Sequence, residues 1–177
     1  MNHRDHVNLL RGAITNPGGV WADLGAGSGA FTLALAELIG PQGRIYALDK
    51  DAGALRAGAR AMSAQFPDIP LETRQADFTH ALDLPRLDGI LMANSLHFIP
   101  HRQKPEVLLR LKGYLRPGGK LVLVEYNVDG GNVWVPYPMS YRTWESMAAQ
   151  AGFKATRLAA TRPSSFLKEF YCAESSA

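Results

Sequence analysis

Apolar residues along the chain follow two alternating spacings, and each spacing predicts one kind of secondary structure. Short apolar runs bounded by turn residues predict five β-strands, which are Val20–Leu24, Arg44–Leu48, Leu71–Gln75, Gly89–Ala93 and Lys120–Tyr126. The stretches between them carry apolar residues three and four positions apart, which predicts amphipathic helices. Strands that alternate with helices and are apolar throughout are typical of a parallel sheet with helices on both faces.

The predicted helices have recognisable start signals. Asp51 is placed to cap a helix over residues 52–66, and Pro105 is placed at the start of a helix that extends to Leu115. Another stripe around Phe31 predicts a helix directly after the first strand. Residues 1–14 predict a short amphipathic helix that Asn2 caps.

The last third of the chain has a different pattern. Residues 140–151 predict a helix that Gly152 ends. Two strand-like runs follow, Ala155–Ala160 and Leu167–Ala173, joined by a turn over residues 161–165. Because so short a connection has no room for a parallel crossover, we expect these two strands to be antiparallel.

Length and composition suit one globular domain over residues 1–177. The chain has 177 residues, of which 46% are hydrophobic and 20% charged. A lone Cys172 cannot form an internal disulfide. No apolar run reaches the length of a membrane span, and the start of the chain does not resemble a signal peptide. We therefore expect a cytoplasmic protein with no membrane partner.

The whole chain has a net charge of +3, and its basic residues concentrate in one part of the sequence. They are Arg102, Lys104, Arg110, Lys112, Arg116 and Lys120. Such a stretch can attract nucleic acid or an anionic substrate. Because these basic residues are interleaved with leucines expected in the core, we favour the simpler interpretation that they form a solvated helix face.

A glycine-rich turn follows the first strand and precedes a helix. Gly25, Gly27 and Gly29 form a G-x-G-x-G pattern, while Gly25, Gly27 and Ala30 also satisfy the dinucleotide pattern. Asp49 ends the next strand, where a carboxylate can accept hydrogen bonds from two ribose hydroxyls. Since dinucleotide and S-adenosylmethionine sites both use an acid there, the residues alone predict a nucleoside-containing ligand of either kind. No Gly-Lys-Ser/Thr follows the turn, which excludes a P-loop.

Five motifs in this order resemble the class I S-adenosylmethionine-dependent methyltransferases, from Val20 to the end of the chain. The motifs are Ala22-Asp23-Leu24-Gly25-Ala26-Gly27-Ser28-Gly29, Ile45-Tyr46-Ala47-Leu48-Asp49, Arg74-Gln75-Ala76-Asp77-Phe78, the stretch from Leu87 to His97, and Leu115-Arg116-Pro117-Gly118-Gly119-Lys120-Leu121-Val122. The resemblance implies an α/β fold, a Rossmann-like three-layer sandwich. Its seven-stranded sheet is mostly parallel, with an antiparallel C-terminal strand and helices on both faces. It divides the domain into a lead-in (1–19), a cofactor-binding core (20–126) and an acceptor-side region (127–177).

The resemblance also implies S-adenosyl-L-methionine as cofactor, S-adenosyl-L-homocysteine as product, and a role for individual residues. The methionine part is surrounded by Asp23 and the backbone of Gly25, Ala26, Gly27 and Gly29, and is reached by Asn94 and Ser95. Asp49 holds the ribose with Lys50 beside the adenine, while Asp77 and Phe78 contact that base. Two simpler interpretations stay open: Asp23 caps the turn, and Asp77 caps a short helix near Thr79.

Methyl transfer from a sulfonium needs positioning more than acid or base catalysis, so no catalytic triad is expected. A hydroxyl, thiol or protonated amine acceptor does require a base, and His97 is the candidate; the alternative is a packing or capping role. The five histidines and one cysteine show no metal-ligand spacing, so we expect no metal.

The acceptor is the open question. Residues 125–141 follow the fifth strand and carry glycines and aromatics, which predicts part of an acceptor pocket or lid. Simple packing of Trp134 and Tyr137 against the loop stays equally open. The chain lacks the longer N-terminal cap of many relatives, which leaves both a monomer and a homodimer possible. It also lacks the Asn/Asp-Pro-Pro-Tyr/Phe motif, which favours a small-molecule acceptor without excluding nucleic acid or protein. Two other functions stay open: a nicotinamide-dependent oxidoreductase and a non-catalytic binding module.

Overall fold

Seven strands form one sheet in the order β3-β2-β1-β4-β5-β7-β6. The computed structural model describes residues 1–177, and its strands are β1 (Gly19–Leu24), β2 (Gly43–Asp49), β3 (Leu71–Gln75), β4 (Leu87–Ala93), β5 (Leu115–Tyr126), β6 (Lys154–Pro163) and β7 (Glu169–Ser176). Every pairing from β3 to β5 is parallel, and β7 runs antiparallel to both β5 and β6. The predicted fold class is confirmed, including the antiparallel strand near the C-terminus.

The helices are α1 (His3–Arg11), α2 (Ala30–Ile39), α3 (Ala52–Gln65), α4 (Lys104–Tyr114) and α5 (Tyr141–Gln150), with 3₁₀ turns η1 (Leu96–Phe98) and η2 (His101–Gln103). The predicted caps are confirmed. Asn2 forms a capping box with Asp5, and the Asp51 side chain accepts from two amides of the first turn of α3. Pro105 lies in the first turn of α4.

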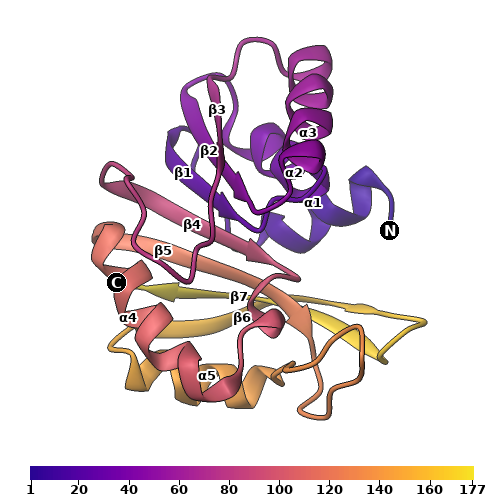
Figure 1. Cartoon of the computed structure of the whole chain (residues 1–177), viewed down its shortest axis with the longest axis vertical. Helices are drawn as coiled ribbons and strands as arrows, with labels where there is room; N and C mark the ends of the chain where they lie inside the picture. The colour runs from indigo at the N-terminus through magenta and orange to yellow at the C-terminus, as the bar shows by residue number, and fades with distance from the viewer.

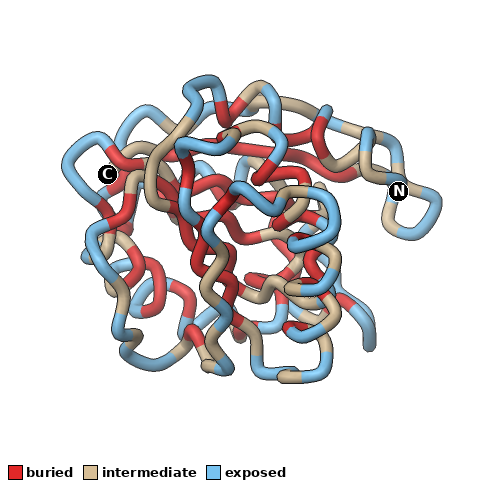
Figure 2. The backbone as a smooth tube through the Cα atoms, turned by 90° about the horizontal axis from the view of Figure 1, so that it is seen from above, coloured by how far each residue is buried: buried red, intermediate tan, exposed pale blue.

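Alternate residues of the central strands pack into two separate cores. On β5, Leu121 and Leu123 join the core beneath α4 and α5, while Val122 and Val124 join the core beneath α1 and α2. Both layers of helices flank the sheet in Figure 1, and Figure 2 shows buried strands between more exposed segments. No helix is long and apolar enough to cross a bilayer.

Three local predictions are wrong. The C-terminal hairpin turns over residues 164–168, because β6 continues to Pro163 before the chain reverses. The segment Leu115–Gly119 belongs to β5, since Leu115 already pairs with Leu87 on β4. Lys104 is fully buried at the start of α4, so the basic stretch is not a uniformly solvated face.

The strand order creates a place for a ligand at one edge of the sheet. From β1 the chain builds outward to β2 and β3, then crosses back to place β4 on the other side of β1. Such a switch point opens a crevice at the carboxyl ends of the strands. In Figure 1 these ends point the same way, toward the loop after β5 and the tip of the β6–β7 hairpin.

Candidate active site

The turn after β1 requires glycine at two places. Gly25 has a φ of 81°, and a Cβ added to it would lie 2.4 Å from the Cβ of Ser95. Gly29 caps α2 with a φ of 89°, and a Cβ added to it would lie 3.0 Å from the Cα of Gly58 on α3. The Gly25 amide donates to the Leu48 carbonyl at 2.8 Å, which ties the turn to β2. The backbone is therefore left open toward the crevice.

Asp49 is held rigidly at the end of β2. Its Oδ2 accepts from the Gly27 amide at 2.8 Å, and its Oδ1 accepts from the Asp51 amide at 2.9 Å. Each carboxylate oxygen has two lone pairs, so one acceptor position on each oxygen is left. Asp49 is half-buried and lines the crevice, where those positions are available to ribose hydroxyls.

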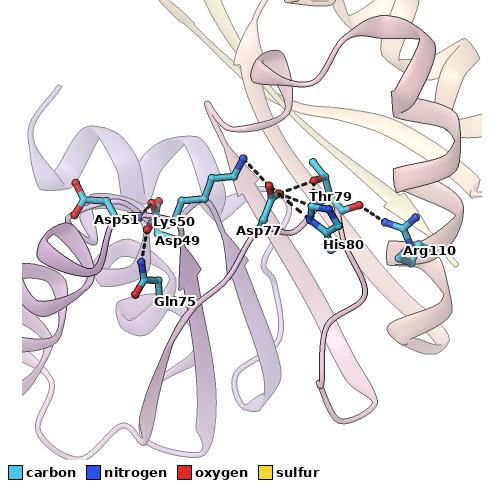
Figure 3. A network of polar contacts seen from close by, with 8 residues as sticks. All are labelled: Asp49, Lys50, Asp51, Gln75, Asp77, Thr79, His80 and Arg110. Atoms are coloured by element: carbon cyan, nitrogen blue, oxygen red, sulfur yellow. Dashed lines mark hydrogen bonds and ion pairs between the residues drawn. The ribbon is translucent and has the colours of Figure 1, made fainter.

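Lys50 and Asp77 form an ion pair across the outer end of the crevice (Figure 3). The distance from Lys50 Nζ to Asp77 Oδ2 is 2.7 Å, and Asp77 Oδ1 accepts from both the amide and the hydroxyl of Thr79. Burial acts to raise the pKa of Asp77, but these hydrogen bonds and the lysine charge outweigh it and hold the pKa at about 2. Asp77 thus performs the local turn-forming role as well as facing the crevice, although no helix starts at Thr79.

Asn94 and Ser95 form the inner end of the crevice. Asn94 has a φ of 54°, a left-handed conformation that asparagine tolerates. Its Oδ1 is buried and has no hydrogen-bond donor. The Ser95 hydroxyl donates to the Leu24 carbonyl at 2.7 Å, which joins the end of β1 to the segment after β4. An unpartnered buried acceptor marks this end as a place for a ligand donor.

The crevice encloses about 380 Å³. Its lining is Gly25, Asp49, Lys50, Ala76, Asp77, Phe78, Asn94, Ser95, Phe98 and Ile99. Seven of these ten were predicted from the sequence as site residues, whereas Ala76, Phe98 and Ile99 were not. Each of the three lies within two residues of a predicted one. Ala26, Gly27 and Gly29 lie in the turn behind Asp49 rather than along the crevice.

Asp23 lies below the crevice and does not line it. The Thr32 hydroxyl on α2 donates to Asp23 Oδ2 at 2.6 Å, and the carboxyl is almost completely buried. Burial raises the pKa of Asp23 to about 7, which the Thr32 hydrogen bond opposes and the charge of Asp49 reinforces. A cation in the crevice would favour the ionised form of this acid.

His97 is buried in η1 and paired with a glutamate that no motif in the sequence predicted. Glu125, at the end of β5, accepts from the His97 backbone amide at 3.0 Å and lies 2.8 Å from the ring Nδ1. A carboxylate partner places the ring proton on Nδ1, so Nε2 carries the free lone pair. His97 does not line the crevice itself, but its neighbour Phe98 does.

Lys104 connects this histidine segment to the loop after β5. Its ammonium donates to the Tyr137 carbonyl and lies 3.2 Å from Nδ1 of His101. The Tyr137 amide in turn donates to the His97 carbonyl at 3.0 Å. Burial lowers the pKa of Lys104 to about 8, which the nearby charge of Glu125 opposes. Loop 127–140 is thereby attached at Tyr137 through both its N–H and its C=O.

No group of three or more histidine, cysteine, aspartate or glutamate side chains is arranged to hold a metal ion. The helix α1 packs against α2 and β6, with His3 hydrogen-bonded to Glu37 at 2.7 Å. The polar part of the site consists of Asp49, Asp77 and the glycine turn, at the carboxyl ends of the parallel strands.

A parallel sheet with a glycine turn after β1 and an acid at the end of β2 defines an α/β protein that binds a nucleoside cofactor. Residues 22–119 match the family model of a methyltransferase domain, which spans more than half of the chain. The chain belongs to the class I S-adenosylmethionine-dependent methyltransferase family. The resemblance of the five motifs to that family is thus confirmed, and S-adenosylmethionine is the cofactor of the family.

Several relatives match over part of their length. The chain is 41% identical over 86 residues to a ribosomal RNA small subunit methyltransferase H from Paracidovorax citrulli, covering 48% of the chain and 26% of that protein. It is 32% identical over 126 residues to a carboxy-S-adenosyl-L-methionine synthase from Ectopseudomonas mendocina, covering 68% of the chain and 51% of that protein. The chain therefore spans between a quarter and about half of the length of these curated relatives.

Solved structures share the fold at low sequence identity. The 1,6-didemethyltoxoflavin-N1-methyltransferase of Burkholderia thailandensis superposes with a TM-score of 0.76 at 19% identity, covering 99% of this chain and 77% of that chain. This likeness concerns the fold.

The residues of the crevice fit S-adenosylmethionine. The cofactor carries a sulfonium and an ammonium, and the crevice is bordered by carboxylates at Asp49 and Asp77 with the buried acid Asp23 beneath. The unpartnered Asn94 Oδ1 is an acceptor of the kind that an ammonium donor satisfies. A side chain at position 25 would collide with Ser95, so glycine keeps the backbone approachable.

Proposed function

We propose that the chain transfers the methyl group of S-adenosylmethionine to a small-molecule acceptor by in-line displacement, with His97 as the base. The observation that carries this proposal is the joining of two features within residues 94–98. Asn94 and Ser95 line the cofactor crevice, and His97 follows immediately with its ring held by Glu125.

Each residue has a defined task in this mechanism. The bound cofactor supplies an activated methyl group on a sulfur that leaves as a neutral thioether. Asp49 binds the ribose, Asp77 accepts from the adenine amino group, and Asn94 Oδ1 accepts from the methionine ammonium. The acceptor heteroatom forms a bond to the methyl carbon as the carbon–sulfur bond breaks, and its proton passes to His97 Nε2. Glu125 stabilises the imidazolium that results.

Cofactor binding is tested first, by isothermal titration of the full chain with S-adenosylmethionine, S-adenosylhomocysteine and NAD. We expect the first two to bind and NAD not to bind. Asp49→Ala should weaken S-adenosylhomocysteine binding at least tenfold, about 1.4 kcal/mol, because two hydroxyl hydrogen bonds are lost. Asp68→Ala, which changes an exposed aspartate in the loop before β3, is the matched control and should leave the affinity unchanged. Binding of NAD alone would contradict the proposal and favour an oxidoreductase.

Turnover is tested by transfer of labelled methyl groups to cell extracts separated into metabolites, RNA and protein. We expect label in the metabolite fraction. His97→Gln should reduce transfer at least 100-fold while S-adenosylhomocysteine affinity stays within twofold of the unmodified chain. Label in RNA or protein would show that the acceptor is a macromolecule. Cofactor binding without transfer to any fraction would favour a binding module.

A further inference from the structure

Aromatic side chains occupy the edge of the sheet beside the cofactor crevice, and two of them are unusually open to solvent. Phe98 in η1 is 59% exposed, and it lines the crevice. Phe166, in the turn between β6 and β7, is 51% exposed. Large apolar side chains that stay exposed next to a binding site are typical of a surface that a ligand covers.

Ring contacts connect these two phenylalanines into one row. Phe166 lies 5.9 Å from Tyr126 between ring centroids, Tyr126 lies 6.3 Å from His97, and His97 lies 4.4 Å from Phe98. We call these four residues the aromatic ledge. They come from the hairpin turn, the end of β5 and η1, three segments that these ring contacts join.

The aromatic ledge has a rigid base. The Tyr126 ring packs on the buried Phe170 of β7 at 4.3 Å between centroids, and the His97 ring is fixed by Glu125. Ring planes along the ledge are tilted by 45° to 60° relative to their neighbours. Tilted aromatic neighbours present both ring faces and ring edges, which are the surfaces that another aromatic ring contacts favourably.

Two charged side chains near the aromatic ledge have partners within the chain. Glu125 lies beneath it, fully buried, and accepts from the His97 amide and ring. Arg162, which pairs with Phe170 across β6 and β7, lies 2.8 Å from Asp5 of α1. Lys168, in the same hairpin turn as Phe166, is exposed and forms no ion pair. A ligand on the ledge therefore meets mainly ring surfaces, with one lysine at the outer end.

We propose that the aromatic ledge binds the methyl acceptor and that this acceptor is a flat aromatic molecule. The proposal deepens the proposed function and rests on it in one respect, namely that the molecule on the ledge is the one that is methylated. The crevice and the ledge share Phe98, so an aromatic ring on the ledge lies next to the cofactor. The His97 ring contacts Phe98 at 4.4 Å between centroids, which places the proposed base beside the same ring surface.

The test uses 2-naphthol as the probe and the full chain in the presence of saturating S-adenosylhomocysteine. We expect chemical-shift changes in the NMR spectrum to concentrate on residues of the aromatic ledge. Decahydro-2-naphthol has the same carbon skeleton without aromatic rings, and it should bind at least fivefold more weakly. Equal binding of the two probes, or shift changes centred elsewhere, would overturn the proposal.

Two exposed apolar residues give a matched pair of variants. Phe166→Ser should weaken 2-naphthol binding at least fivefold and leave S-adenosylhomocysteine affinity unchanged, because Phe166 does not line the crevice. Leu109→Ala changes a residue that is 64% exposed on α4, and it should alter neither affinity. Unfolding midpoints of both variants check that each is folded. Unchanged 2-naphthol binding by Phe166→Ser would overturn the proposal.

A second copy of the chain is the competing occupant, and sedimentation velocity detects it. The proposal would be overturned if the unmodified chain is a dimer, Phe166→Ser dissociates that dimer, and the chain does not bind 2-naphthol. That result would assign the ledge to self-association. The proposed function is tested separately, since 2-naphthol can also be titrated without cofactor. Loss of S-adenosylhomocysteine binding with intact 2-naphthol binding would refute the proposed function and leave the ledge as an aromatic-binding surface.

Discussion

Two acid–base pairs stand at the same edge of the sheet in opposite environments. Lys50 and Asp77 are 2.7 Å apart, and the lysine is 67% exposed. His97 and Glu125 are 2.8 Å apart and buried, with 3% and 0% of their side chains exposed. Solvent screens the outer pair, so opening it costs little, whereas either member of the inner pair is costly to leave without its partner. The outer pair is thus suited to exchange its partner for a ligand, and the inner pair is suited to hold a ring in one orientation.

The surroundings of the two pairs reinforce this difference. Glu125 accepts three hydrogen bonds from the protein, from the amide and ring of His97 and from the amide of Tyr126. Asp77 accepts from Thr79, a residue of its own turn, and from the exposed end of a lysine side chain. Substitutions at the two pairs should therefore separate into effects on folding and proton transfer at the inner pair and effects on cofactor affinity at the outer pair.

The largest effect is expected for Glu125→Gln. Glutamine keeps the volume but removes the charge and replaces one acceptor oxygen by a donor nitrogen that faces buried N–H groups. The free energy of unfolding should fall by about 3 kcal/mol, and methyl transfer should fall roughly 100-fold because His97 loses the partner that orients it. Urea denaturation and the labelled-methyl assay measure the two quantities.

Glu106→Gln is the control for that variant. Glu106 lies in the first turn of α4 and also has a basic partner, Arg110 at 2.7 Å, but it is 79% exposed. Its substitution should change stability by less than about 0.5 kcal/mol. An equal loss of stability in both variants would mean that burial does not distinguish the two sites.

Lys104→Met should have the second-largest effect. Methionine matches the length of the lysine stem but leaves the Tyr137 carbonyl without its donor, which should cost about 1–2 kcal/mol at pH 7. The Tyr137 amide should exchange its hydrogen roughly tenfold faster, since a difference of 1.4 kcal/mol corresponds to a factor of ten. Lys154→Met, at an exposed lysine that begins β6, should change neither.

The pH dependence of the same variant has a defined sign. The pKa of Lys104 is lowered from 10.5 to about 8, so between these values the unfolded chain holds a proton that the folded chain has lost. The contribution of Lys104 to stability therefore rises with pH across this window. The stability difference between the unmodified chain and Lys104→Met should grow from pH 8 to pH 10. A constant difference would contradict the lowered pKa.

The outer pair was predictable from the sequence, whereas most of the inner cluster was not. Lys50 directly follows β2 and Asp77 lies two residues after β3. The carboxyl ends of parallel strands meet at one edge, which brings the two together. His97 was a candidate for the same reason. Glu125 ends an apolar strand without any motif, and its role depends on the approach of η1, 28 residues away in sequence. Lys104 stood in a run of basic residues that pattern alone assigns to solvent, and only its contact with loop 127–140 explains its burial.

Asp77→Asn is expected to affect binding more than folding. The amide can still accept from Thr79 but no longer pairs with Lys50, so stability should fall by about 1 kcal/mol after screening is considered. Affinity for S-adenosylhomocysteine should fall roughly tenfold, measured by titration calorimetry, because a carboxylate is a stronger acceptor for the adenine amino group. A loss of several kcal/mol in stability without a change in affinity would show that Asp77 only forms the turn.

Acid titration sharpens the interpretation of this variant. The pKa of Asp77 lies at about 2, below its ordinary value of 3.8. Its contribution to stability is therefore complete above pH 4 and is lost as the pH falls toward 2. The stability advantage of the unmodified chain over Asp77→Asn should disappear across that range. A difference that stays the same at pH 3 and pH 7 would contradict the assignment.

The smallest effect is expected for Lys50→Met, which removes the exposed member of the outer pair. Stability should change by less than about 0.5 kcal/mol, and that change should shrink further in 0.5 M salt, because the lysine charge is screened by water and ions. Cofactor affinity should change by no more than about threefold, because two effects offset each other. The adenine loses a nearby lysine charge, but Asp77 no longer has to release Lys50 before it accepts from the adenine amino group. A loss of affinity as large as that of Asp77→Asn would show that Lys50 itself binds the cofactor, and the outer pair would then be a fixed part of the site like the inner one.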